Sequence, residues 1–399
     1  MKIKEQELYV HIPFCMKKCN YCDFLSGVYD EKMRRTYTAA LVKELEYLGK
    51  TYRHPLRSIY FGGGTPTWLE TDCIQLLMDT IYKWFQVVEG AEITLECNPG
   101  TVTKDSLRAF HMMGFNRLSI GLQSANEEEL KLLGRVHDLN RFLHTFELAR
   151  NAGFMNINVD VMTGLPYQNP KKLQYTLDTV VRLHPEHISA YSLIIEKGTP
   201  FYDDYQFDSV RQEAGMQTEA LPTEDQVYEL TKQTEHFLAE NGYRKYEISN
   251  FAKPGYEGEH NSGYWRMVPY LGAGLGASSY IDGMRFSNKT NIYDYIEASK
   301  KYEEMETSKH LWMDSDTLQE RTRNDEIEEF MFLGLRMTDG VSLFDFEERF
   351  HTRMDLIYRN VIEELRREGL LDMYEGRVFL TERGMDLSNY AMAKFLLED

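Results

Sequence analysis

The sequence predicts an α/β fold: an incomplete (β/α)6 barrel, then an α+β extension and a small winged-helix-like C-terminal module. Three observations favour this fold. Short β-rich runs alternate with amphipathic stretches over residues 1–200, as parallel βαβ units do. Polar residues recur where these runs end, and that end of a parallel barrel is where ligands bind. The last part of the chain has the pattern of three helices followed by a hairpin.

Six strands and six helices are expected in the barrel. The strands are predicted near Leu8–Ile12, Ser58–Phe61, Glu92–Glu96, Arg117–Gly121, Asn156–Val161 and His187–Leu193. The helices are predicted near Lys32–Leu48, Thr71–Phe85, Lys104–Met113, Glu127–Leu133, Leu139–Ala152 and Pro170–Leu183. Six units are fewer than the eight of a closed barrel, so we expect an open one. We place this domain at residues 1–200, the extension at 201–320 and the C-terminal module at 321–399.

The pattern loosens after Pro200. We expect a polar, acidic stretch over Tyr202–Glu224, a helix near Asp225–Asn241, a Gly-rich segment at 270–277 and a linker with some helix at 300–324. The module then has predicted helices at Glu326–Arg336, Leu343–Phe350 and Met354–Glu368, a hairpin at Leu371–Leu380 and a last helix. From Arg321 onward, 11 Lys and Arg face 18 Asp and Glu. This acidity favours packing or partner docking over the DNA binding that a winged helix also suggests.

Charge and composition limit the function classes. The formal net charge of −18 over 399 residues argues against a broad nucleic-acid-binding surface. No apolar run reaches the length of about 18 residues that a membrane-spanning helix needs. The first residues, Met1–Glu7, lack the apolar region of a secretion signal. We therefore expect a protein of the reducing cytoplasm.

Three cysteines follow the first predicted strand with the spacing C-x3-C-x2-C: Cys15, Cys19 and Cys22. Three thiolates on one loop can hold three corners of a [4Fe–4S] cluster and leave one iron open. The open iron suits the amino and carboxylate groups of S-adenosylmethionine (SAM). The alternatives are a structural zinc site, for which only His11 is near enough to be a fourth ligand, and a disulfide framework, for which five cysteines are few. Cys73 and Cys97 are expected to be ordinary small buried residues.

Polar groups are predicted at the ends of successive strands. The Gly62–Thr67 run follows the second strand, and its glycines let backbone approach a ligand and direct N–H groups at it. Glu96 ends the third strand and can accept hydrogen bonds from a ribose diol. Gln123 ends the fourth, and Asp160 is an acid in an otherwise apolar fifth strand. Arg135 can pair with an anionic group. Singly, each of these residues also fits a plain structural role.

Together these residues resemble the radical SAM enzymes related to oxygen-independent coproporphyrinogen III oxidase, over about Tyr9 to Leu397. The resemblance implies that Cys15, Cys19 and Cys22 ligate the cluster. It also implies a set of SAM-site residues, which are Tyr9, Tyr21, Gly63, Gly64, Thr65, Glu96, Gln123, Arg135 and Asp160.

Two details separate the branches of this family. The oxidase has a further Cys two residues after the third ligand and a longer segment before the Cys loop, whereas here that position is Phe24. In contrast, the run His260–Trp265 is similar to the H-N-x-x-Y-W signature of the heme-chaperone branch. His260 is a candidate axial ligand of heme iron, and Tyr264 and Trp265 offer flat faces to a porphyrin. The residues alone, without the resemblance, favour a loop in which His260 and Asn261 bond to backbone groups and Trp265 packs inward.

The resemblance leaves two function classes. A heme chaperone would bind heme as cargo and deliver it to hemoproteins such as respiratory enzymes, with peripheral contact to membrane-bound acceptors, as a monomer or homodimer. Arg244, Lys245 and Arg266 are then candidates for pairing with the heme propionates. The alternative is the oxidase, which would use SAM cleavage to decarboxylate propionate side chains of coproporphyrinogen III. Radical-driven heme breakdown or alkylation is a third use of the same machinery. Whether the chain is an enzyme stays open at this point.

Overall fold

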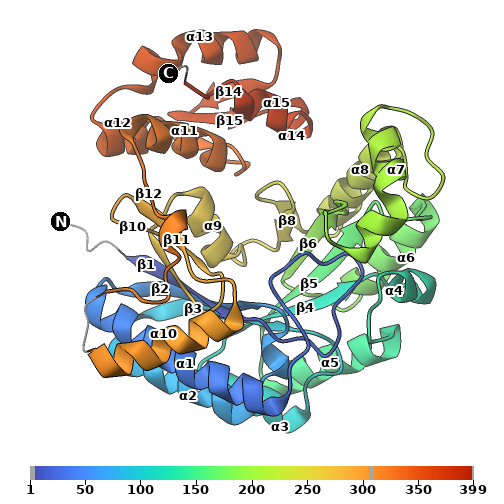
Figure 1. The fold of residues 1–399 in the computed structure, drawn as a ribbon. Helices are drawn as coiled ribbons and strands as arrows, with labels where there is room; N and C mark the ends of the chain where they lie inside the picture. The colour runs from blue at the N-terminus through green and yellow to red at the C-terminus, as the bar shows by residue number, and fades with distance from the viewer. Residues whose placement is uncertain (1–4, 306–308, 398–399) are drawn as a thin grey trace.

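The computed structural model describes residues 5–305 and 309–397, and its first part is an open barrel with helices on the outer face (Figure 1). Six neighbouring parallel strands form the barrel wall: β1 (Gln6–Ile12), β2 (Leu56–Gly63), β3 (Val87–Cys97), β4 (Arg117–Gln123), β5 (Asn156–Thr163) and β6 (His187–Ser192). All six predicted strands are therefore confirmed. Because each strand runs in the same direction, their carboxyl ends meet at one rim of the barrel.

Six helices lie between the strands. They are α1 (Glu31–Thr51), α2 (Thr71–Trp84), α3 (Lys104–Met112), α4 (Glu127–Leu132), α5 (Leu139–Ala152) and α6 (Pro170–Val181), with a short 3-10 turn at Pro66–Trp68. Local sequence explains where several begin. The Asp30 and Asp138 side chains accept from backbone N–H groups of the first turns of α1 and α5. Asn169 caps α6, whose first residue is Pro170. The apolar faces of α1, α2, α3, α5 and α6 share one large core with the strands, whereas Leu132 of α4 packs in a smaller cluster with Leu133 and Met162.

The extension lengthens the sheet at both edges. Beside β1 lie β9 (Tyr270–Ala273), which is parallel to it, and then β10 (Ser278–Ile281), β11 (Met284–Ser287) and β12 (Gln319–Glu320). Beside β6 lie β8 (Asn250–Ala252) and β7 (Arg244–Lys245), both formed by antiparallel pairing. The helices of this region are α7 (Pro200–Glu213), α8 (Glu224–Glu240), α9 (Glu259–Trp265) and α10 (Ile292–Met305). A 3-10 turn spans Ser315–Thr317, and residues 306–308 of the predicted linker lie outside the described residues.

The C-terminal module has its own hydrophobic core, which includes Phe346, Leu365 and Phe395. Its elements are α11 (Arg323–Gly334), β13 (Val341–Ser342), α12 (Leu343–Phe350), α13 (Met354–Arg367), β14 (Leu371–Tyr374), β15 (Arg377–Leu380), α14 (Glu382–Asp386) and α15 (Ser388–Ala393). The strands form a separate sheet in the order β13-β15-β14. The helices and hairpin occur in the predicted order, and the winged-helix comparison itself stays an interpretation.

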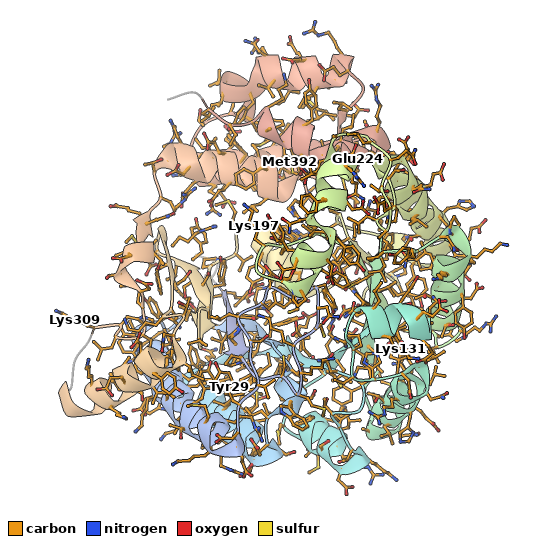
Figure 2. The ribbon with its side chains drawn as sticks, turned by 45° about the vertical axis from the view of Figure 1, so that its right-hand side comes forward. Tyr29, Lys131, Lys197, Glu224, Lys309 and Met392 are labelled. Atoms are coloured by element: carbon orange, nitrogen blue, oxygen red, sulfur yellow. The ribbon has the colours of Figure 1, made fainter. Side chains whose placement is uncertain are left out.

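Charged side chains such as Lys131, Lys197 and Glu224 project from the surface, whereas Met392 is buried in the C-terminal module (Figure 2). Within the described ranges, no helix is both long and apolar enough to cross a membrane.

Candidate functional site

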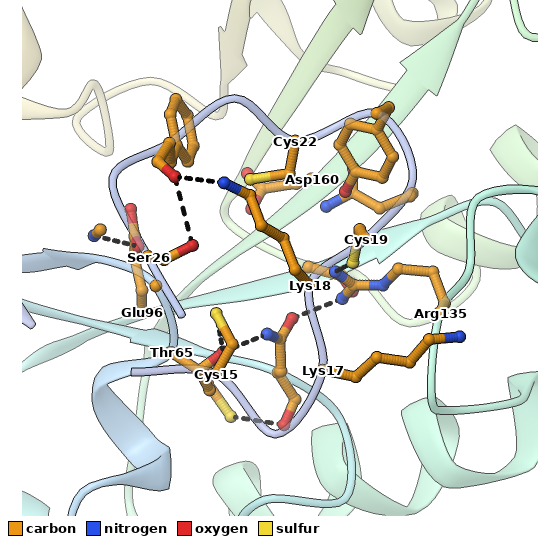
Figure 3. A pocket seen from close by; sticks show the side chains of 18 of the residues that line it. Cys15, Lys17, Lys18, Cys19, Cys22, Ser26, Thr65, Glu96, Arg135 and Asp160 are labelled. Carbon is orange, nitrogen blue, oxygen red and sulfur yellow. Dashed lines mark hydrogen bonds between the residues drawn. The ribbon is translucent and has the colours of Figure 1, made fainter. Parts of the chain in front are cut away.

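A pocket lies at the carboxyl rim of the barrel, between the loop after β1 and the ends of β2, β3, β4 and β5 (Figure 3). Most of the residues predicted for the site line this pocket. They are Cys15, Cys19, Tyr21, Cys22, Gly63, Gly64, Thr65, Glu96, Gln123, Arg135 and Asp160. Segments more than a hundred residues apart in the sequence thus meet, as the parallel topology requires.

The cysteine loop is held against the end of β2 by backbone hydrogen bonds. The N–H of Gly64 donates to the Ile12 carbonyl (2.9 Å), and the N–H of Thr65 donates to the Phe14 carbonyl (2.7 Å). The N–H of Gly63 donates to a carboxyl oxygen of Glu96 (3.1 Å). A Cβ at position 64 would lie 2.8 Å from the Phe14 carbonyl oxygen, so glycine is required there. The expectation that these N–H groups point at a ligand is therefore wrong, because the fold itself uses them.

Polar groups approach the cysteine sulfurs. Arg135 Nη1 donates to Cys19 Sγ (3.5 Å), and Thr65 Oγ1 donates to Cys15 Sγ (3.8 Å). Burial raises the pKa of Cys22 to about 11 and also raises that of Cys15, so metal binding must displace thiol protons. A cationic guanidinium and a hydroxyl next to the sulfurs then favour the thiolate form. This donor set fits an iron–sulfur cluster.

The zinc alternative needs His11 as a fourth ligand beside the three cysteines. His11 Nε2 contacts the Leu25 carbonyl (2.8 Å), and its Nδ1 contacts the Tyr9 hydroxyl (3.0 Å). Both ring nitrogens are therefore engaged in this conformation, which disfavours His11 as a zinc ligand.

Arg135 and Asn98 form the floor of the pocket. Arg135 Nη2 donates to the side-chain oxygen of Asn98 and to the Gly121 carbonyl (2.6 Å), and Asn98 Nδ2 donates to Thr65 Oγ1 (2.6 Å). We did not predict Asn98 from the sequence, although its place two residues after Glu96, next to the end of β3, was a usable signal. Gln123 has a φ of 71°, a left-handed conformation that is unusual for a residue other than glycine and that accompanies functional sites.

Two carboxyl groups face the pocket from neighbouring strands. Glu96 accepts from the Tyr60 hydroxyl (2.8 Å) as well as from Gly63, and burial raises its pKa to about 7. Asp160 accepts from Asn158 (2.7 Å) and Ser119 (3.4 Å), and burial raises its pKa too. Oxygen atoms of this kind can accept hydrogen bonds from hydroxyl and amino groups of a nucleoside.

Tyr9 lies elsewhere than predicted. It is absent from the pocket lining; its hydroxyl contacts His11 Nδ1 (3.0 Å), and its ring stacks on Tyr60 at 6.2 Å. Cys97 is buried in the main core, as predicted, and it also lines the pocket. Burial raises the pKa of Cys97 to about 12.

The predicted heme residues lie apart from the cysteine pocket. They occupy α9, where the His260 side chain contacts Ser58 near the start of β2 and the first N–H groups of the helix donate to Glu92 of β3. His260 is 1% exposed; its Nδ1 contacts Ser58 Oγ and its Nε2 contacts the Tyr264 hydroxyl, both at 2.8 Å. In this conformation neither ring nitrogen is free for iron, which disfavours His260 as an axial ligand. Trp265 is turned to the C-terminal module and packs near Tyr246 and Met337.

A chain of side-chain contacts joins the cysteine pocket to α9. Glu96 in the pocket accepts from Tyr60, and the Tyr60 ring stacks on the His260 ring with centroids 5.2 Å apart. Tyr264 follows, with its ring 4.9 Å from His260. A carboxyl group of the pocket and the histidine of α9 are therefore separated by one tyrosine side chain.

Comparison with known protein families agrees with this architecture. Residues 9–180 match the radical SAM superfamily, and residues 322–387 match the HemN C-terminal domain. Among solved structures, that of Escherichia coli coproporphyrinogen III oxidase (HemN), described as a radical SAM enzyme, superimposes with a TM-score of 0.81. The two share 25% identity, and the match covers 98% of this chain and 90% of the oxidase.

Curated relatives match over nearly the whole chain. The heme chaperone HemW of Bacillus subtilis is 36% identical over 394 residues, which cover 98% of this chain and 99% of that protein. The heme chaperone HemW of Lactococcus lactis is 33% identical over 99% of this chain and 98% of its own length. The HemW of Escherichia coli is 37% identical over 70% of this chain and 71% of its own.

Proposed function

Because the chain belongs to the HemW family within the radical SAM superfamily, we propose that it is a heme chaperone that binds heme and delivers it to hemoproteins. The observation that carries the proposal is the similarity to HemW proteins from end to end, which includes the His260–Trp265 signature and the C-terminal module. Phe24 adds support: it lines the cysteine pocket, 62% exposed, at the position where the oxidase branch has a further thiol.

In this proposal the cysteine pocket is the cofactor site. Cys15, Cys19 and Cys22 hold a [4Fe–4S] cluster, and Tyr21, Gly63, Gly64, Thr65, Glu96, Gln123, Arg135 and Asp160 surround SAM, with Tyr9 behind them. A cluster with bound SAM supplies one-electron reduction chemistry. The part of the protein is to orient the groups: Arg135 fixes Cys19 and the pocket floor, and Tyr60 fixes Glu96.

The acceptors and the cellular place belong to the same proposal. Respiratory enzymes are the proposed hemoprotein acceptors, reached from the cytoplasm by peripheral contact with the membrane. The chain acts as a monomer or homodimer.

The test is a titration of the anaerobically purified protein with heme, followed by the Soret band, and then transfer to an apo-hemoprotein. A saturable, near-stoichiometric spectral change and transfer faster than that of free heme would support the proposal. If heme does not bind saturably and the protein instead decarboxylates coproporphyrinogen III in the presence of SAM and a reductant, the oxidase alternative is correct.

The contact of His260 with heme iron that the sequence suggested, and that its hydrogen bonds disfavour, can be tested through its hydrogen-bond partner. Tyr264→Phe removes the hydroxyl that occupies His260 Nε2. If Nε2 binds iron, this variant should bind heme at least as tightly as the wild type, while His260→Ala should bind it more weakly. Equal binding by all three proteins would remove His260 from the heme site and leave the chaperone proposal standing.

A further inference from the structure

We propose that Arg336, together with the indole N–H of Trp265, binds one propionate carboxylate of heme. This inference rests on the proposed function and assigns a residue outside the His260–Trp265 signature to it. Trp265 is the last residue of α9 and Arg336 lies two residues beyond α11, so the two meet where the C-terminal module joins the barrel.

The two side chains are stacked. The guanidinium carbon of Arg336 lies 4.2 Å from the centroid of the Trp265 ring, within the range of a favourable cation–π contact. The stacking fixes the plane of the guanidinium, and both side chains are half-buried. A fixed, partly desolvated guanidinium is a strong donor for a carboxylate, because it loses little conformational freedom on binding.

Among the residues that the structure describes, neither side chain finds a hydrogen-bond acceptor. Over residues 5–305 and 309–397, Arg336 makes no ion pair or hydrogen bond, and its Nε is buried without a partner. The Nε1 of Trp265 is also buried without a partner. Glu247 attracts Arg336 from a distance, but it forms no ion pair with it and accepts from the Ser249 N–H (2.8 Å).

Other arginine Nε atoms in the described structure also lack a hydrogen-bond partner, but Arg57, Arg117, Arg285 and Arg321 each pair with a carboxylate. Arg336 differs from them because it has no paired carboxylate, and the Trp265 ring on which it stacks also carries an unpartnered N–H. Two such donors on stacked side chains point to an acceptor that a ligand brings.

The three cations that the sequence suggested as partners of the heme propionates either pair with carboxylates or are exposed to water. Arg266 pairs with Asp339 at 3.6 Å, and Lys245 pairs with Glu235. Arg244 is exposed to water, where an unpaired charge carries no penalty. Arg336 differs from these three because it combines partial burial with the lack of a paired carboxylate in the described structure, where Glu247 attracts it only from a distance. A propionate would supply the missing hydrogen-bond acceptor, and the adjoining indole offers a flat apolar face for the edge of the macrocycle.

The experiment compares heme with heme dimethyl ester, in which both carboxylates are blocked. We expect Arg336→Gln to weaken heme binding about tenfold to a hundredfold, as the loss of a charge-assisted hydrogen bond does, and to leave binding of the ester unchanged. Arg336→Lys should recover part of the affinity, because it keeps the charge without the two-pronged geometry. Trp265→Phe, which keeps the ring and removes the N–H, should weaken heme binding about threefold to tenfold. Arg359→Gln, at an exposed arginine of α13 that pairs with Asp355, is the matched control and should change neither ligand.

Equal losses for heme and its ester in Arg336→Gln, or no loss for either, would overturn the inference while the chaperone proposal stands. If the wild-type protein binds neither ligand saturably, the chaperone proposal and this inference fall together. Thermal unfolding of the apo-proteins separates a structural role. Because Arg336 has no ion-pair partner, Arg336→Gln should unfold close to the wild-type temperature; a clear drop would mark Arg336 as a structural residue and contradict the inference.

Discussion

At the scale of single residues, the five cysteines differ in what surrounds their sulfurs. Cys15, Cys19 and Cys22 line a pocket that also holds Lys17, Lys18 and Arg135, whose charges favour thiolates. The two other cysteines are buried, and Cys97 directs its sulfur to the Asn98 carbonyl (3.6 Å). A cysteine can therefore line the pocket, as Cys97 does, without having its sulfur placed to bind iron.

We predict that Cys15→Ala, Cys19→Ala and Cys22→Ala each prevent assembly of a stable cluster, because two remaining thiolates cannot hold it. Cys97→Ala and Cys73→Ala should retain it. The measurement is iron and sulfide content per chain after anaerobic reconstitution. Cys97→Ala is the demanding control, since this residue lines the same pocket. A cluster that survives in Cys22→Ala, or is lost in Cys97→Ala, would contradict the assignment.

Glu7 is a buried acid that the sequence analysis did not single out. It lies in β1 with no exposed surface, and neither of its carboxyl oxygens has a hydrogen-bond partner in the described structure. Arg57 approaches to 3.7 Å. Burial raises the pKa of Glu7 from 4.5 to about 9, so the folded protein keeps a proton that the unfolded chain releases above pH 4.5.

Stability should therefore fall as the pH rises from about 4.5 to about 9, since the unfolded state binds fewer protons there. We predict that Glu7→Gln raises the free energy of unfolding by about 1–3 kcal/mol at pH 7 and by much less at pH 5. Chemical denaturation at both values measures it. Glu44→Gln is the contrasting control: this buried carboxyl accepts from Gly274, Asn288 and Tyr295, and its replacement should destabilise. If Glu7→Gln raises the free energy of unfolding equally at pH 5 and pH 7, protonation of Glu7 is not the cause of the gain.

The residue types in the sequence predicted the lining of the cysteine pocket better than they predicted the surroundings of the His260–Trp265 signature. Thiolates, acids and an arginine at strand ends share one rim, because parallel strands place them there. His260 and Tyr264 are four residues apart and face each other once the segment is a helix, which spacing alone can show. The contacts of His260 with Ser58 and Tyr60 join segments about two hundred residues apart, and no local pattern encodes them.

At the scale of secondary structure, the barrel elements were predictable because each has a strong local pattern. Leu139–Ala152 and Leu343–Phe350 have the predicted bounds, and most others shift by a few residues at the ends. Most elements of the extension were missed, and two of them show why. Helix α7 lies in the acidic stretch, which hid its apolar positions, and β9 lies in the Gly-rich segment. Gly272 is needed in β9 because a Cβ there would lie 2.2 Å from the Ser278 carbonyl oxygen. Glycine at this position allows the two strands to lie close together, whereas a Gly-rich run in the sequence is usually taken to indicate a loop.

Helix α9 packs so closely on β1 that an added methyl group at Gly263 would clash with it. A Cβ at Gly263 would lie 1.9 Å from a carboxyl oxygen of Glu7. We predict that Gly263→Ala lowers the free energy of unfolding by about 1–3 kcal/mol, although alanine is the better helix former. Glu259→Ala, at the exposed start of the same helix, should change it by less than about 0.5 kcal/mol.

A second substitution tests the cause of that loss. Glu7→Ala removes the obstructing carboxyl group, so Glu7→Ala combined with Gly263→Ala should be more stable than the two single effects sum to, by about 1 kcal/mol or more. Additive effects would mean that Gly263→Ala acts through the backbone of α9 and not through its contact with β1.

At the scale of the whole molecule, the cysteine pocket and α9 lie toward opposite ends of the barrel strands, and a junction joins the barrel to the C-terminal module. The cysteine pocket lies at the carboxyl rim, α9 lies toward the amino ends of the strands, and Tyr60 contacts both. The C-terminal module docks beyond α9. Arg349 and Glu326 contact the Tyr280 hydroxyl, and Lys232 of α8 pairs with Asp386 at 2.7 Å. Any ligand held between α9 and the module thus lies where their relative position affects its binding.

Glu329 is the central charge of this junction. Its side chain is 6% exposed and pairs with Arg285 of β11 (3.1 Å) and with Arg321 just before α11 (2.6 Å). Removal of the acid leaves two partly buried arginines without their partner, and breaking such a buried pair costs about 3–5 kcal/mol. Because the module has its own core, we expect that loss to fall on docking more than on folding of the module itself.

We predict that Glu329→Ala loosens the module from the barrel. Hydrogen exchange should quicken in α9, β11 and the start of α11, while the amides of β2, β3 and β4 keep their protection. Glu348→Ala, an exposed acid on α12, is the matched control and should leave exchange unchanged. If Glu329→Ala instead quickens exchange evenly through the barrel and the module, the two unfold as one cooperative unit, and the junction is part of a single core.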